Sequence, residues 1–288
     1  MSDRLRVTEA DSLLIFLSAK LQGWSKKKIK QRLQGGCVVV NGESVVKHDH
    51  ALNVGDNVEV LAPGKRFVTS KSTQANLQLE ILFRDRDLIV INKPAGLLSV
   101  ATAQESKLHA LAILRNQLSH GGQAVKLWPV HRLDRDTSGV LMFATSREMR
   151  EAVNAKWSEA EKVYLAVVEG VPEPDRGTIN QPLRLDSKQY KMHVGAHAEA
   201  KDAITHYSTK RTVNQRSLLE VNLETGRQHQ IRAHLSWLGC PVVGDPRYGT
   251  AGLKMGLHAL RLTITRPKTG ERLTCEAPTP TDLITLLR

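Results

Sequence analysis

One short polar segment, residues 131–139, carries the residue types best suited to chemistry. It holds two carboxylates two positions apart, Asp134 and Asp136, beside two arginines and a histidine. Apolar stretches at 127–130 and 140–143 flank it, which predicts a loop held between buried strands. Such loops are common places for reactive groups. Taken alone, these residue types fit an acid/base pair, a metal site or a salt-bridge network.

The segment resembles the catalytic signature of the RluA family, the stand-alone pseudouridine synthases that modify ribosomal and transfer RNA. All nine residues from 131 to 139 fit that signature. Further stretches similar to the family follow in the expected order: 92–96, 162–166, 225–234, 244–249 and 257–259. The resemblance therefore spans roughly residues 79–280. It departs at Ala200, where similar sequences commonly carry glycine, which affects a local turn rather than the chemistry.

The resemblance also implies roles for individual residues. Asp134 would be the essential carboxylate, Arg232 its partner, and Tyr164 the aromatic side chain against the target base. Asp136 is expected to support the loop rather than to react. The side chains expected to bind the substrate nucleotide are Arg132, which would help hold it out of its stack, His131 and Lys162.

The chemistry of pseudouridine formation explains these residue types. Uracil must leave the anomeric carbon, turn over and rejoin through a ring carbon, so an anion beside the sugar can act as nucleophile or take a sugar proton. An arginine keeps that carboxylate ionised, because an opposite charge lowers its pKa. Tyr164 could stack on the base, help remove the proton from the ring carbon, or both. The target uridine must be flipped out or already unpaired.

We expect neither a cofactor nor a metal. Isomerisation needs no redox equivalents and no activated donor, and the sequence lacks a phosphate-binding glycine loop. Four histidines suggest a metal site, but no two have the i, i+4 spacing of a helical zinc motif. We expect them to be structural or to contact RNA: His131, His229, His234 and His258. The three cysteines are widely separated and are expected to be structural thiols: Cys37, Cys240 and Cys275.

Two other functions are compatible with the sequence. One is an RNA-binding or ribosome-assembly factor whose large domain mainly binds. It would be favoured if Asp134→Asn fully replaced the wild type in cells, and the intact signature argues against it. The other is a hydrolase that cuts N-glycosidic or phosphodiester bonds with Asp134 and Asp136. Release of free uracil or chain cleavage would favour that reaction.

Residues 1–62 predict a small α+β domain. Apolar residues at helical spacing predict a first helix over 11–21, with the Asp-Ser pair at its start capping the first amides. A second helix begins at the N-cap Ser25 and ends at the glycine pair 35–36, which can take the left-handed conformation that ends helices. A hairpin follows, because Asn41-Gly42 is the pair that tight two-residue turns prefer.

The second helix carries a basic cluster, and no acidic residue occurs between Trp24 and Gly42. A solvated helix face usually mixes the two signs of charge. The order of helices and hairpin, together with this cluster, resembles the RNA-binding domain first described in a ribosomal small-subunit protein. The expected RNA-binding residues are Lys26, Lys27, Lys28, Lys30 and Arg32.

The whole chain has a formal net charge of +12, which indicates a polyanionic partner, because lysine and arginine replace phosphate counterions. With the resemblance, this predicts structured RNA as the partner. Large-subunit ribosomal RNA is the preferred target and transfer RNA the alternative. No apolar run is long enough to cross a bilayer, and the start of the sequence lacks the apolar stretch of a secretory signal, so we expect a cytoplasmic protein, with a monomer as the default.

The remaining organisation follows from composition and pattern. Residues 63–76 have little apolar content and predict a linker, and residues 77–288 form the expected catalytic domain. From the resemblance we expect a large α+β domain, with a mixed, mostly antiparallel sheet flanked by helices and Asp134 in a central basic cleft. The expected elements include strands over 79–83 and 88–91, a helix over 146–160 begun by a capping box of Thr145 and Glu148, and a helix over 228–238 ended by Gly239.

Overall fold

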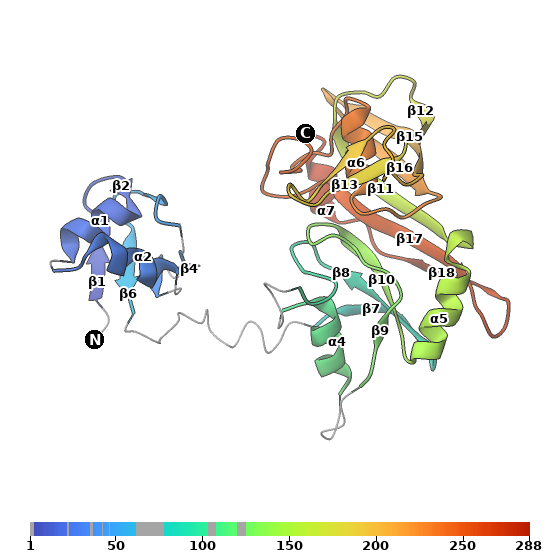
Figure 1. Ribbon diagram of the computed structural model, residues 1–288, viewed down its shortest axis with the longest axis horizontal. Helices are drawn as coiled ribbons and strands as arrows, with labels where there is room; N and C mark the ends of the chain where they lie inside the picture. The colour runs from blue at the N-terminus through green and yellow to red at the C-terminus, as the bar shows by residue number, and fades with distance from the viewer. Residues whose placement is uncertain are drawn as a thin grey trace. The chain divides into compact units, whose positions relative to one another are not determined.

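The computed structural model divides the chain into two compact units, Met1–Leu77 and Gln78–Arg288 (Figure 1). The residues that it describes are 3–21, 23–34, 37–41, 43–45, 47–61, 78–102, 108–119 and 125–288. The predicted linker, 63–76, lies outside these residues. Each unit has its own hydrophobic core.

The described part of the first unit contains an antiparallel sheet in the order β1-β6-β3-β4, two helices and the strand pair β2 with β5. The apolar positions expected on the helices meet the sheet in one core, in which Leu13, Leu17 and Ile29 pack with Val38 and Val58. The elements are β1 Asp3–Arg6, β2 Asp11–Ser12, α1 Leu13–Lys20, α2 Lys26–Gln34, β3 Val38–Val40, β4 Glu43–Ser44, β5 Ala51–Leu52 and β6 Asn57–Val60.

Of the helix caps and turns predicted for the first unit, some are confirmed and one is wrong. Ser25 caps α2 as expected, since its Oγ accepts a hydrogen bond from the backbone N–H of Lys28 at 3.2 Å. The hairpin is also confirmed, with Asn41 at a φ of 50° between β3 and β4. The predicted cap of α1 is wrong, because Ser12 makes no side-chain cap hydrogen bond and pairs with β5 instead. Gly42 and the glycine pair 35–36 lie outside the described residues.

The second unit is built on one large mixed sheet. Within the described residues it has ten strands in the order β12-β15-β16-β11-β17-β10-β8-β7, with β18 beside β17 and β9 beside β10. Only the β10–β17 pair is parallel among these strands, so the mixed, mostly antiparallel sheet is as predicted. A separate hairpin pairs β13 with β14.

The elements of the second unit are β7 Glu80–Arg84, β8 Leu88–Lys93, α4 Ala110–Leu118, β9 Trp128–Pro129, β10 Ser138–Ala144, α5 Arg147–Ala155, the 3-10 helix η1 Trp157–Glu159, β11 Glu161–Glu169, β12 Arg176–Asn180, β13 Leu183–Asp186, β14 Lys191–Val194, β15 Ile204–Val213, β16 Arg216–Leu223, α6 Gln230–Trp237, β17 Leu257–Thr265, β18 Arg272–Glu276 and α7 Thr281–Thr285.

The burial of β8 on both of its faces explains why residues 88–91 are all apolar. Ile89 and Ile91 belong to the core that includes α4, while Leu88 and Val90 belong to the core that includes α5. Successive side chains of a strand point to opposite faces, so a helix covers each face of this half of the sheet (Figure 1). The strand that precedes the reactive loop, β9, and the strand that follows it, β10, are thereby held in a rigid frame.

The predicted helix over 146–160 is shorter in the structure. It ends at Ala155 and is followed by η1. Its cap is Ser146, whose Oγ accepts from the N–H of Met149 at 3.1 Å, and not Thr145, whose hydroxyl donates to Arg86 and Asp87 carbonyls instead. Both residue types can cap a helix, so only the tertiary partners of Thr145 decide between them.

The predicted helix over 228–238 is also shorter, because α6 begins at Gln230. Its N-cap residue, His229, has a φ of 52°, a left-handed conformation that only a few per cent of non-glycine residues adopt. Gly239 follows the helix with a φ of 85°, as expected of a glycine that ends a helix.

The three cysteines are buried thiols outside any disulfide, as expected of structural thiols: Cys37, Cys240 and Cys275. Burial raises the pKa of Cys275 to about 11, so its sulfur stays protonated at neutral pH. In the part of the chain that the structure describes, no helix is long and apolar enough to cross a bilayer.

Candidate active site

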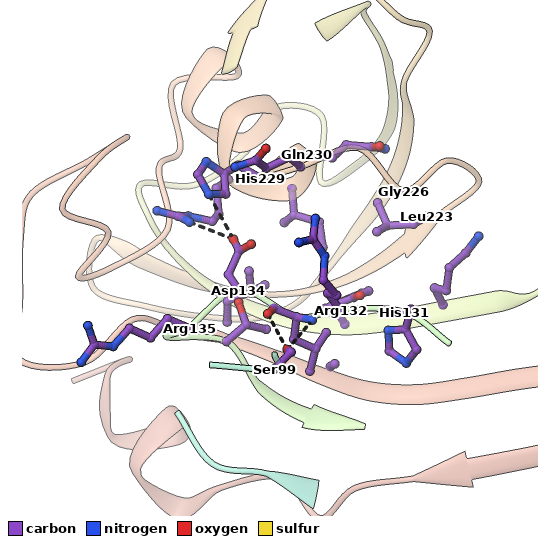
Figure 2. A pocket seen from close by; sticks show the side chains of 18 of the residues that line it. Ser99, His131, Arg132, Asp134, Arg135, Leu223, Gly226, His229 and Gln230 are labelled. Atoms are coloured by element: carbon purple, nitrogen blue, oxygen red, sulfur yellow. Dashed lines mark hydrogen bonds and ion pairs between the residues drawn. The ribbon is translucent and has the colours of Figure 1, made fainter. Parts of the chain in front are cut away.

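The loop between β9 and β10 places Asp134 in a cleft of about 810 Å³. Figure 2 shows the side chains of Arg132 and Asp134 rising from this loop into the pocket, with Arg135 extending to one side. The loop backbone is clamped from below, because the hydroxyl of Ser99 donates to the carbonyl of Leu133 at 2.7 Å and accepts from its N–H at 3.0 Å (Figure 2). The backbone of the reactive segment is therefore held rigidly in place.

A second clamp comes from Lys93 at the end of β8, whose side chain is fully buried. Its Nζ donates to the carbonyls of Pro94, Leu97 and Arg135, at 3.0, 2.7 and 3.0 Å. Burial lowers the pKa of Lys93 to about 7, although the charges of the two loop aspartates act in the opposite direction. These three hydrogen bonds of Nζ tie the loop to the strand end beneath it.

Gly139, the last residue of the signature, is required by the approach of two strands. It lies in β10 with a φ of 108°, and a Cβ built there would lie 2.1 Å from the carbonyl oxygen of Ala259 in β17. Because β10 and β17 form the parallel pair of the sheet, this glycine lets the strand after the loop reach its neighbour.

Asp134 is held by an arginine that is itself held by a second carboxylate. The Nη1 of Arg232 donates to Oδ2 of Asp134 at 2.8 Å. The Nε and Nη2 of the same guanidinium donate to the two oxygens of Asp245 at 2.7 and 2.9 Å. The side chain of Asp245 is fully buried and that of Arg232 is 8% exposed, whereas that of Asp134 is 27% exposed. Asp134 is thus the member of the triad that the cleft can reach.

The environment fixes the charges of Arg232 and Asp245. Burial would raise the pKa of Asp245, but the hydrogen bonds and charge of Arg232 and the backbone N–H groups of Arg247 and Tyr248 bring it below its ordinary value. Burial would lower the pKa of Arg232, yet its two carboxylate partners raise it. Arg232 therefore stays protonated and Asp245 ionised at neutral pH.

Tyr164, on β11, lines the cleft and packs against two apolar cores, one that includes α4 and one that includes α6. Burial raises the pKa of its phenol, and the nearby charge of Asp134 raises it further. The ring is therefore neutral throughout the physiological range. Arg132 is exposed and lines the same cleft.

His131 and Lys162 gather around Trp157 rather than around Asp134. The ring of His131 stacks on Trp157 with centroids 5.1 Å apart, and its Nε2 accepts from the N–H of Met142 at 3.2 Å. Burial lowers the pKa of His131 to about 4, so the imidazole is neutral. The Nζ of Lys162 lies 5.9 Å from the Trp157 ring centroid and donates to the carbonyl of Glu224. Both residues line the cleft, and Figure 2 shows His131 apart from Asp134.

His229, for which the sequence predicts only a structural role or a contact with RNA, lies beside the carboxylate. Its Nε2 is 3.8 Å from Oδ2 of Asp134, and its Nδ1 is 3.1 Å from the hydroxyl of Tyr248. Figure 2 shows the imidazole facing Asp134 across the cleft. The sequence indicates no role for Lys93, Asp245 or Tyr248 either. Each of these three residues lies in a stretch that resembles the family, and this position is the sequence feature that could have indicated a role for them.

The cleft is strongly basic. The only carboxylates among its lining residues in the described chain are Asp134 and Asp136. The basic residues that line it are Arg132, Arg135, Lys162, Arg227, Arg232, Arg247 and Arg261. Within the described residues no group of three or more histidine, cysteine or acidic residues is placed to hold a metal ion.

In the first unit, the basic cluster divides into two kinds of side chain. Arg32 donates to the carbonyl of Leu61 at 3.0 Å and lies over the ring of Trp24, so its guanidinium is engaged within the unit. Lys28 also lies over Trp24, with Nζ 4.3 Å from the ring centroid. The exposed members are Lys26, Lys27, Lys28 and Lys30.

Comparison with known proteins shows the family of this chain. Residues 87–237 match the family described as RNA pseudouridylate synthase. The chain is 34% identical to the uncharacterized RNA pseudouridine synthase YlyB of Bacillus subtilis, over 94% of this chain and 91% of that protein. It is 32% identical to ribosomal large subunit pseudouridine synthase D of Nitrosomonas europaea, over 94% of this chain and 82% of that protein. The solved structure of human RNA pseudouridylate synthase domain containing 4 shares 28% identity and superposes with a TM-score of 0.58, covering 75% of this chain and 93% of that one. The chain therefore belongs to the RluA family of RNA pseudouridine synthases and is an isomerase.

Proposed function

We propose that this enzyme converts specific uridines of large-subunit ribosomal RNA to pseudouridine, with Asp134 as the catalytic carboxylate. Relatives from three bacteria, 30 to 32% identical, are named as synthases that act on the ribosomal large subunit, which supports this target. Transfer RNA is the alternative target. The exposed lysines of the first unit support binding to structured RNA of either kind.

The observation that carries the catalytic proposal is the one-sided anchoring of Asp134. Arg232 and His229 both approach Oδ2, and Oδ1 makes no hydrogen bond or ion pair with the described residues. Oδ2 is then the oxygen that fixes the direction of the carboxylate, and Oδ1 is free to meet the sugar. Preorganised donors that hold a reacting anion without needing to move are among the largest contributors to catalysis.

In the proposed reaction the bond between N1 of uracil and the anomeric carbon breaks. Asp134 either attacks that carbon or removes a proton from the sugar, and both routes begin from the ionised carboxylate. The base turns over and its ring carbon C5 bonds to the anomeric carbon; in the first route the bond from Asp134 to that carbon breaks, and in the second Asp134 returns the proton to the sugar. The proton on C5 then leaves, and N1 carries a proton in the product. The ring of Tyr164 is neutral, and it could stack on the base or relay the C5 proton.

The remaining cleft residues would hold the flipped nucleotide. Arg132, which is exposed on the reactive loop, would occupy the gap left in the RNA stack or bind a phosphate. Lys162 and His131, around Trp157, offer a second contact point for the nucleotide chain at another part of the cleft. The conversion rearranges one nucleotide without loss of atoms, so the proposal requires no redox cofactor and no group donor.

The test is pseudouridine mapping of ribosomal and transfer RNA from cells that lack the gene. The cells are complemented with wild type, Asp134→Asn, or Asp175→Asn as a control at a carboxylate that is 71% exposed. We expect sites in large-subunit RNA to vanish, and to return with wild type and Asp175→Asn but not with Asp134→Asn. Loss of sites in transfer RNA alone would contradict the ribosomal target. Restoration by Asp134→Asn would contradict the catalytic assignment.

A further inference from the structure

A chain of three contacts runs from the hairpin β13–β14 to the reactive carboxylate. The backbone N–H of Met192 in β14 donates to the hydroxyl of Tyr248 at 2.7 Å. That hydroxyl lies 3.1 Å from Nδ1 of His229. The Nε2 of His229 then lies 3.8 Å from Oδ2 of Asp134. In this series of contacts, the hydrogen bonds that one group makes determine which atom of the next group carries a proton.

The hydrogen-bond roles of Tyr248 fix the tautomer of His229. Because the Tyr248 oxygen already accepts from Met192, its own hydrogen needs an acceptor, and Nδ1 of His229 is the one within reach. If Nδ1 carried a proton instead, the hydroxyl hydrogen would be buried without a partner, since Tyr248 is 8% exposed. Nδ1 is therefore the acceptor, and the proton of the neutral ring lies on Nε2.

The ring is also confined in position. His229 precedes α6 in the left-handed conformation, and its imidazole meets the Tyr248 ring edge-on with centroids 5.7 Å apart. Burial lowers the pKa of His229 and outweighs the nearby carboxylates, so the neutral ring is favoured at physiological pH. The charged groups that face it are Asp134, Arg232, Arg247 and Asp245.

We propose that His229 is a positioning residue of the isomerisation, whose Nε2–H, fixed by Tyr248, holds Oδ2 of Asp134 so that Oδ1 reacts. This inference rests on the proposed catalytic role of Asp134. The separation of 3.8 Å is longer than a hydrogen bond, and such contacts in free enzymes often tighten only when substrate binds. Arg232 holds the same oxygen at 2.8 Å, so His229 supplies the second direction of restraint.

Two replacements separate the two ring nitrogens. The side-chain amide of His229→Gln reaches the position of Nε2 and keeps a donor toward Asp134. The shorter amide of His229→Asn reaches the position of Nδ1 and loses that donor, although asparagine tolerates the left-handed backbone well. We expect His229→Asn to lower kcat about 10- to 100-fold with little change in KM, and His229→Gln to retain most of the wild-type kcat. Tyr248→Phe should lower kcat as well, because it removes the donor that orients the ring.

A spectroscopic measurement tests the tautomer without any assay of activity. The protein has 11 histidines, so His229 is assigned in ¹⁵N-histidine-labelled protein as the ring signals that are absent from His229→Gln. Long-range ¹H–¹⁵N correlations should show the Nε2–H tautomer in wild type and a mixture of tautomers in Tyr248→Phe. A Nδ1–H tautomer in the wild type would overturn the inference.

The kinetics distinguish failure of this inference from failure of the proposed function. Equal kcat values for His229→Gln and His229→Asn, alongside an inactive Asp134→Asn, would overturn only the positioning role of His229. Full activity of Asp134→Asn would overturn the catalytic role of Asp134 and the inference together.

Discussion

Arg232 donates from Nη1 to Oδ2 of Asp134 across 2.8 Å, although 98 residues separate the two in the chain. Nε and Nη2 of the same guanidinium donate to Asp245, so one arginine joins the reactive carboxylate to a buried one. The planar fork of arginine permits this arrangement, and a lysine cannot reproduce it.

Replacing Arg232 by lysine should therefore lower kcat about 100- to 1,000-fold, because a preorganised donor to the reacting group is removed. KM for RNA should change little. The matched control is Arg216→Lys, since Arg216 makes a similar two-point contact with Glu169 at 3.0 and 3.1 Å but does not line the cleft. A kcat for Arg232→Lys equal to that of this control would contradict the assigned role.

Asp245→Asn should destabilise the fold as well as impair activity. The substitution removes the charge that balances a buried guanidinium, and breaking a buried ion pair from one side costs about 3–5 kcal/mol. Urea unfolding of the variant beside Asp175→Asn, at an exposed carboxylate, measures the difference. Equal free energies of unfolding for the two variants would show that Asp245 is not needed to hold Arg232.

Lys93 gives a pH-dependent stability with a definite sign. Its pKa falls from an ordinary value of 10.5 to about 7 in the folded protein, so between these values the unfolded chain binds more protons. The free energy of unfolding should then rise with pH in this window, by up to about 1.4 kcal/mol per pH unit, and the gain should be lost as the pH falls through 7. Urea unfolding of wild type and Lys93→Met at pH 7, 8 and 9 isolates this contribution as the difference between them. A difference that does not vary with pH would contradict it.

Gly139→Ala should disrupt the junction between the reactive loop and the sheet. A Cβ at this position would collide with the Ala259 carbonyl, and the backbone is in a region that alanine rarely adopts. We expect a loss of at least about 2 kcal/mol in stability and a large loss of activity. Gly226→Ala is the control for stability, because nothing lies within 4 Å of a Cβ at that position. The melting temperatures of the two variants measure this difference. Equal melting temperatures would show that the strands can move apart without loss of stability.

The exposed lysines of α2 should contribute to RNA affinity through phosphates. Replacing the four together by glutamine should raise Kd for RNA and reduce the slope of log K against log salt concentration by about 0.7 to 0.9 for each phosphate that is no longer neutralised. The residues to change are Lys26, Lys27, Lys28 and Lys30. The kcat at saturating RNA should stay close to wild type. Lys268→Gln, which removes an exposed lysine that is paired with Asp87, is the control. An unchanged salt slope would refute RNA binding by α2.

Local signals in the sequence accounted for much of the fold. Apolar flanks located the reactive loop, Ser25 marked the start of a helix, and the unbroken apolar run at 88–91 fits a strand covered on both faces. Where two local signals were equivalent, the prediction failed. Thr145 and Ser146 can both cap a helix, and the choice was made by carbonyls near residue 86 that no local pattern reveals.

The composition of the site depended on contacts between distant segments. The resemblance supplied Asp134 and Arg232, but it did not reveal that Asp245 secures Arg232 or that Lys93 supports the loop from β8. The place of His229 could not be inferred from its spacing, because its left-handed backbone interrupts the helical pattern just before α6. These positions follow from the pairing of strands and from buried charges that need partners.

The catalytic role of Asp134 can be tested with purified protein and RNA labelled with tritium at C5 of uridine, since that hydrogen must leave when the new carbon–carbon bond forms. Wild type, Asp134→Asn and the control Asp175→Asn are compared for tritium release from ribosomal RNA under single-turnover conditions. We expect release by wild type and by Asp175→Asn, and none by Asp134→Asn although this variant still binds the RNA. Tritium release by Asp134→Asn at the wild-type rate would contradict the assignment of Asp134 as the catalytic carboxylate.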